Sequence, residues 1–199
     1  ICELAELADA VIVSGAGPSG VVPYSHPRFM GVGGSKGSIC GNYAMANADL
    51  VIVIAARAVC QWDCSGTAWG KAQCIINFNA DPVAACHYNR SLPILGEARG
   101  NLRRLIEHLR RTGSSARSRP SAWLEANQAR KREWEELKRK RFENPLLPDP
   151  GWKREVLTQP AAIKMAYDFA RERKAACYFD AGDVQANGFQ LAEDEQLGL

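Results

Sequence analysis

The residues of this chain whose types and spacing could support chemistry are its cysteines. Cys60 and Cys64 lie four positions apart in the stretch "ARAVCQWDCSG" at 56–66. Three further potential metal ligands follow along the chain: Cys74, Cys86 and His87. Cysteines with this spacing commonly supply two of the four ligands of a zinc ion. The same pair could also form a disulfide or a redox centre, or lie in a loop that follows a strand.

Cysteine usage bears on the choice between these interpretations. The chain has seven cysteines, an odd number without a regular framework, which favours a reducing compartment over a disulfide scaffold. Cys74 begins an apolar run that we expect to be a buried strand, which makes it a poor zinc ligand. We therefore predict structural thiols, no metal ligand and a cytoplasmic location. A zinc site and a Cys60–Cys64 disulfide remain the alternatives.

Apolar runs that alternate with helical patterns must position any such site. Strands are predicted within four segments: 9–20, 49–56, 72–81 and 91–98. Helical spacing is present at 37–48, where Ser38 could cap the helix, and at 98–111. Continuous β-branched runs are typical of strands that are covered on both faces, as in parallel sheets. The pattern predicts an α/β fold with an open, mostly parallel sheet and flanking helices.

The composition changes after residue 111. A Ser-, Gly- and Arg-rich linker at 112–121 leads into a charged helix at 122–143, whose charges we interpret as a solvated face. A second linker at 144–151 contains three prolines. A helix at 158–174 and a strand at 175–183 that runs into a loop follow. The predicted units are therefore 1–111, a linker with a charged helix at 112–157, and the beginning of a second α/β unit at 158–199.

Composition also argues against two classes of partner. The net charge of +3 is far from the polybasic character of nucleic-acid-binding proteins, so we expect no nucleic-acid partner. The longest apolar runs, such as "LVIVIAA" at 50–56, are much shorter than the roughly 20 residues that a spanning helix requires. We also expect no membrane partner. The first residue is Ile1 rather than Met, which suggests a piece of a larger protein.

The order of five motifs resembles a known family. The motifs are "SGAGPSGVVPYSHPRFMGVGGSKGS" (14–38), "ADLVIVIAAR" (48–57), "IINFNADP" (75–82), "LPILGEARGNLRRLIEHL" (92–109) and "ACYFDAGDVQ" (176–185). In this order they resemble the central domain, and the start of the C-terminal domain, of thiamine-diphosphate-dependent enzymes of the acetolactate synthase type. The resemblance implies a Rossmann-like central domain at 1–111 and an incomplete thiamine-diphosphate-binding domain at 158–199.

The resemblance also implies sites. Residues that bind FAD or an adenine nucleotide in some relatives map onto Ser35, Lys36, Gly37, Arg57, Asn79 and Glu97. Asn79 stands where the family commonly has Asp, and Glu97 stands where an Asp usually follows the glycine. The loop near the thiamine diphosphate group maps onto Asp180, Gly182 and Gln185. Asp183, where the family often has Gln, would repel phosphate.

The implied function is that of a fragment of a thiamine-diphosphate-dependent enzyme, a lyase or transferase acting on 2-oxo acids or related carbonyl compounds. Its cofactors would be thiamine diphosphate and Mg²⁺, held by residues outside this chain, so the chain alone should be inactive and carry no catalytic residue. The alternative is a stand-alone adenine-nucleotide-binding or regulatory module. The partners expected are a small-molecule substrate and further copies of the chain, as a dimer or tetramer, because a strand at 176–179 would have no sheet of its own.

Overall fold

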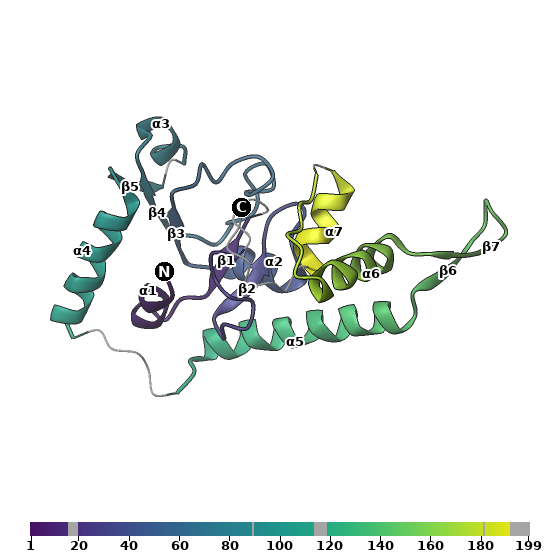
Figure 1. The fold of residues 1–199 in the computed structure, drawn as a ribbon. Coiled ribbons are helices and arrows are strands. Elements are labelled where there is room, and N and C mark those ends of the chain that lie inside the picture. The colour runs from purple at the N-terminus through teal and green to yellow at the C-terminus, as the bar shows by residue number, and fades with distance from the viewer. Residues whose placement is uncertain (16–19, 89, 114–118, 181, 192–199) are drawn as a thin grey trace.

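The computed structural model describes residues 1–15, 20–88, 90–113, 119–180 and 182–191 (Figure 1). Its first half contains five strands in two parallel ladders. One ladder pairs β1 (Ile12–Ser14) with β2 (Phe29–Val32). The other has the order β3 (Leu50–Ile54), β4 (Cys74–Asn79) and β5 (Ser91–Leu95). The predicted α/β class with parallel strands is therefore confirmed.

Four helices connect or flank these strands. They are α1 (Cys2–Leu7), α2 (Ile39–Asn47), α3 (Pro82–Ala85) and α4 (Ala98–Arg111). The helix starts follow local chemistry. The Ser38 hydroxyl accepts a hydrogen bond from the Gly41 amide at 3.1 Å, which confirms the predicted cap of α2. Asp81 caps α3 in the same way, with Pro82 in the first turn.

The charged helix α5 (Ala122–Glu143) also takes part in the core of the first half. It runs along α2 (Figure 1), and its Trp134 is 5% exposed in a cluster with Met30, Cys40 and Ala44. Much of the charge lies in solvent, as predicted, but Lys138 is buried. Its ammonium lies 3.0 Å from a Glu135 carboxylate oxygen and donates to the Tyr24 hydroxyl at 3.2 Å. The helix is thus fastened to the 21–28 segment.

The predicted linker at 144–151 contains regular structure. Residues of β6 (Leu146–Asp149) pair antiparallel with β7 (Arg154–Leu157), and this hairpin projects away from the strands of the first half (Figure 1). Pro148 is tolerated because a two-stranded ladder leaves one edge of each strand unpaired. The prolines do end the preceding helix, but the chain continues as a strand.

The predicted strand at 175–183 is wrong within the residues that the structure describes. Residues 175–180 have no regular structure, and α7 (Asp183–Leu191) begins where the loop was expected. Phe179 of this segment packs between helices instead of in a sheet. The Phe179 ring lies 6.3 Å from the Tyr167 ring of α6 (Gln159–Glu172), and it fills the space beside Gly188 of α7. The argument for an oligomer from an unpaired strand here does not hold, and the oligomer itself stays a prediction.

None of the helices in the described ranges is both long and apolar enough to span a membrane.

Candidate functional site

The loops that follow the parallel strands meet at one end of the two ladders. The 33–38 loop follows β2, and the 55–66 loop follows β3. The Ser35 amide donates to the Gln61 carbonyl at 2.8 Å, which joins these loops directly. Ligands of open parallel sheets bind at the carboxyl ends of the strands. This end is therefore the candidate site.

The 55–66 loop has an unusual backbone. Five of its non-glycine residues have positive φ: Ala55, Ala58, Cys60, Cys64 and Ser65, with values between 50° and 62°. Left-handed backbone costs an L-residue about 1–2 kcal/mol. A loop with several such residues persists only where neighbouring contacts hold it.

Asp63 and Tyr88 supply those contacts. Asp63 is 3% exposed, and the Tyr88 hydroxyl lies 2.6 Å from its Oδ2 and 2.6 Å from the Ala58 carbonyl oxygen. Burial raises the pKa of Tyr88 above its ordinary value, and the Asp63 carboxylate raises it further. The other carboxylate oxygen, Oδ1, is buried without a hydrogen-bond partner among the described residues. The Tyr88 hydroxyl is therefore the hydrogen-bond partner that holds the Asp63 carboxylate, and with it the 55–66 loop.

Replacing Tyr88 with Phe is expected to lower the free energy of unfolding by about 2 kcal/mol, because the buried Asp63 carboxylate loses its hydroxyl partner. Urea unfolding at pH 7, followed by circular dichroism, measures the change. Tyr178 is exposed, so Tyr178→Phe is the matched control and should leave the midpoint unchanged. Equal midpoints for the two variants would contradict this role of Tyr88.

The same contact predicts a pH dependence. Because the folded pKa of Tyr88 is raised above its ordinary value of 10.0, the unfolded chain releases this proton first as the pH rises. The stabilisation is fully present below pH 10 and is lost as the pH approaches the folded pKa. The stability difference between the wild type and Tyr88→Phe should therefore shrink above pH 10.

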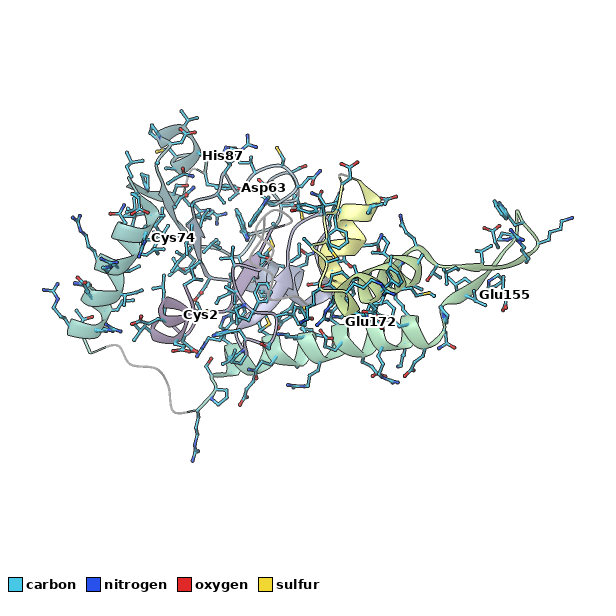
Figure 2. The ribbon with its side chains drawn as sticks, in the orientation of Figure 1. Cys2, Asp63, Cys74, His87, Glu155 and Glu172 are labelled. Atoms are coloured by element: carbon cyan, nitrogen blue, oxygen red, sulfur yellow. The ribbon has the colours of Figure 1, made fainter. Side chains whose placement is uncertain are left out.

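The cysteines and His87 do not form a metal-binding cluster among the described residues. All seven are free thiols, so the structure contains no Cys60–Cys64 disulfide. Figure 2 shows Asp63 in the 55–66 loop, Cys74 on β4 and His87 in the segment after α3. Within the described ranges, no group of three or more His, Cys, Asp or Glu side chains is placed to hold a metal ion.

The glycines at the strand ends make room for the protein itself. A Cβ atom at Gly15 would overlap the indole of Trp62, and one at Gly34 would overlap the Gln61 carbonyl oxygen. Gly34 also has φ +98°, which favours glycine. A Cβ at Gly37 would lie 2.7 Å from the backbone of Gly33. The 55–66 loop therefore packs into the space beside Gly15 and Gly34, whereas Gly37 packs against its own loop.

Three further predicted binding residues lie at the ends of β3, β4 and β5. Arg57 is exposed in the 55–66 loop. The Asn79 amide donates to the Ala56 carbonyl at 3.0 Å, and its oxygen accepts from the Asp81 amide at 3.0 Å. Asn79 thus has a structural role at the position where the family commonly has Asp.

Glu97, like Asn79, forms hydrogen bonds within the chain itself. Its two carboxylate oxygens accept hydrogen bonds from the Arg99 and Gly100 amides, each at 2.6 Å, at the start of α4. These bonds, the one from Gly100 first, lower the pKa of Glu97. Glu97 is therefore the N-cap of α4.

The first turn of α4 is expected to fray as the pH falls below about 4.5. The depressed pKa of Glu97 means that its stabilisation is present above its ordinary value of 4.5 and is lost as the pH falls through the folded pKa. Amide exchange of Arg99 and Gly100 measures the fraying. Glu97→Ala should show fast exchange at every pH, whereas Glu107→Ala on the same helix should not.

The structure brings the two halves of the predicted site together at Lys36. The Lys36 ammonium donates to the Gly182 carbonyl at 3.0 Å. The side-chain amide of Gln190 donates to the backbone carbonyl of Lys36 at 2.9 Å. Gln185 lies in the first turns of α7, half-buried, and Asp180 is exposed before it. Ser35, exposed, and Gly37 flank Lys36. Helix α7 therefore packs against the glycine-rich 33–38 loop.

Parallel strands, flanking helices and loops gathered at the strand ends define a Rossmann-like α/β domain. Residues 1–105 match the family described as thiamine pyrophosphate enzyme, central domain. The chain belongs to this thiamine pyrophosphate enzyme family. A search of curated proteins finds no match to the chain.

The described residues do not form an open binding site for either a nucleotide or thiamine diphosphate. For a nucleotide, the groups of Lys36, Asn79 and Glu97 are engaged within the chain, and Trp62 and Gln61 occupy the space at the glycines. For thiamine diphosphate with Mg²⁺, the described part of the chain brings no three His, Cys, Asp or Glu side chains together to hold a metal ion. Asp183 also adds negative charge to the first turn of α7. We therefore place no chemical step on these residues.

Sequence reasoning missed the residues that shape this end of the sheet: Gln61, Trp62 and Tyr88. Trp62 carried a signal, because a large aromatic residue between two cysteines in a loop is a natural anchor. Tyr88 carried none, because its partner Asp63 lies 25 residues away.

Proposed function

We propose that the chain serves in a thiamine-diphosphate-dependent enzyme of the acetolactate synthase type, a lyase or transferase. Its substrates would be 2-oxo acids or related carbonyl compounds, converted by decarboxylation, carboligation or C–C cleavage. The family match over residues 1–105 carries the proposal. Thiamine diphosphate, when bound with Mg²⁺, supplies the electron sink for such reactions.

In this proposal the chain itself has a scaffold role. Residues 1–111 form the central domain, 112–157 connect it, and 158–199 begin the cofactor-binding domain. The contact of Lys36 with Gly182 supports a fixed relation between the first and last of these units. A nucleotide or FAD would need Trp62 to move, and Ser35 and Arg57 are the exposed polar residues that would then meet it. A dimer or tetramer in the cytoplasm completes the proposal, and the seven free thiols suit that compartment.

The test compares two samples by isothermal titration with thiamine diphosphate and Mg²⁺: the chain of 199 residues and the intact protein that contains it. We expect binding by the intact protein, together with turnover of a 2-oxo acid such as pyruvate, and none by the chain alone. An intact protein that binds no thiamine diphosphate would overturn the proposal. Titration of the chain with FAD and ADP is the parallel measurement. Nucleotide binding without any thiamine diphosphate binding by the intact protein would favour the nucleotide-binding module.

A further inference from the structure

Helix α4 carries a face of arginine side chains that lies outside the candidate site at the strand ends. The helix has five arginines, and Glu107 is its one acidic residue. Because each residue turns the helix by about 100°, its leucine and isoleucine side chains fall on one side and its arginines on another. The apolar side is half-buried, and the arginine side is exposed. The exposed arginines are Arg99, Arg103, Arg104, Arg110 and Arg111.

The C-terminal half of this arginine face is hollowed. A hollow of about 550 Å³ is lined by Arg104, Glu107, Arg110 and Arg111. Small-molecule sites have volumes of roughly 300–1,000 Å³. The spacing of residues 104, 107 and 111 places their side chains along one stripe of the helix. Arg110 lies beside this stripe and forms an ion pair with Glu3 of α1.

The charges around the hollow are not balanced within the described part of the chain. A guanidinium group stays positively charged in proteins. Among the described residues, no carboxylate lies within ion-pair distance of Arg104 or Arg111. The helix dipole accounts for cations in the last turn, but Arg104 lies in the second turn. An anion from solution would supply the missing negative charge.

The lining of the hollow favours a small phosphate compound over a protein surface. Protein interfaces exclude charged side chains from their buried centres, and covering these four charged groups would require a partner for each of them. A small anion in an open hollow leaves the arginines in contact with water. Guanidinium groups match phosphate oxygens with paired hydrogen bonds. Glu107 would repel a bare anion, but a carboxylate accepts hydrogen bonds from hydroxyl groups such as those of ribose.

We propose that this hollow binds a small organic phosphate that carries two phosphate groups and free hydroxyl groups. Arg104 and Arg111 would bind the phosphates, and Glu107 would accept hydrogen bonds from the hydroxyls. Sugar bisphosphates and nucleoside diphosphates share this chemistry. The proposal goes beyond the proposed function, because it requires no thiamine diphosphate.

The hollow is separate from the candidate site at the strand ends. Glu97, which caps the start of α4, belongs to that site, and Arg111 is the last residue of the helix. At 1.5 Å per residue, the two positions lie roughly 20 Å apart along the helix axis. Figure 1 shows α4 and α7 on different sides of the parallel strands.

The test is isothermal titration of the chain of 199 residues, and of the intact protein that contains it, with fructose 1,6-bisphosphate and ADP. We expect binding in both samples, and the tighter ligand identifies the source as a sugar or a nucleotide. Arg104→Gln and Arg111→Gln should each weaken this binding at least about tenfold, because each removes a charged hydrogen-bond donor. Arg99→Gln, at the other end of the same helix, is the matched control and should leave the affinity unchanged.

Inorganic pyrophosphate and Glu107→Gln test the hydroxyl contact. Pyrophosphate has the charges but no carbon-bound hydroxyl, so it should bind the wild type more weakly than the organic phosphate. Glu107→Gln removes a negative charge that repels phosphate, so it should tighten pyrophosphate binding. The preference for the organic phosphate over pyrophosphate should therefore narrow in this variant.

Four results would overturn the proposal. The first is no binding of either organic phosphate, and the second is binding that Arg104→Gln and Arg111→Gln leave unchanged. An ADP signal of the second kind would belong to the strand ends. The third is pyrophosphate binding as tight as that of the organic phosphates, and the fourth is binding by the chain that the intact protein lacks. None of these results bears on thiamine diphosphate binding, so the two proposals fail separately.

Discussion

Replacing Gly34 with Ala is expected to lower the free energy of unfolding by about 3 kcal/mol. Two effects add at this position. The residue has φ +98°, a conformation that alanine adopts only under strain. The new Cβ would also overlap the Gln61 carbonyl oxygen and lie 3.1 Å from the Trp62 Cα, and backbone atoms do not yield as side chains do. Urea unfolding followed by tryptophan fluorescence measures the loss.

Gly66→Ala separates the two effects. Gly66 has φ +88°, close to that of Gly34, but no atom lies near the position of its Cβ. This variant should cost only the backbone strain, about 1 kcal/mol. The difference of about 2 kcal/mol would then measure how tightly the 55–66 loop closes on the end of β2. Equal losses in the two variants would mean that the loop gives way freely, and the candidate site would then be open to a ligand.

The strands of the second ladder were predictable because their chemistry is local. The runs at 49–56 and 72–81 contain the observed β3 and β4, since continuous β-branched residues leave no polar face for a helix or an edge. Strand β2 escaped prediction, because "FMGV" at 29–32 is short and interrupted by a glycine. Its four residues are all buried, which depends on α2 and α5 and not on the strand's own pattern.

The predicted site residues lie after the strands, but several of them bond to groups of the chain itself. Parallel topology alone puts Arg57, Asn79 and Glu97 after strands, so their gathering at one end follows from the fold. What fills the space between them does not follow, because the contact of Trp62 with Gly15 joins residues 47 positions apart. The wrong strand at 175–183 has the same cause. "ACYF" has the pattern of a strand, but Phe179 finds its apolar neighbours on α6 and α7.

Replacing Trp134 with Ala is expected to lower the free energy of unfolding by about 3–5 kcal/mol, the largest effect predicted for this chain. Trp134 belongs to the segment that the sequence assigns to a linker, yet it is 5% exposed among Met30 of β2 and Cys40 and Ala44 of α2. Its removal would leave a cavity inside the first half of the protein. Urea unfolding, followed by circular dichroism, should show one transition at a lower midpoint.

Trp152→Ala is the matched control, because it makes the same chemical change in the same predicted linker. Trp152 lies in the turn between β6 and β7 and is 68% exposed, with the Arg154 guanidinium over its ring. Its loss should cost no more than about 0.5 kcal/mol. A large effect of Trp134→Ala beside a small one of Trp152→Ala would show that α5 folds with the central domain. Two small effects would mean that the parallel strands fold stably without α5, and that the domain ends at residue 111 as the sequence predicts.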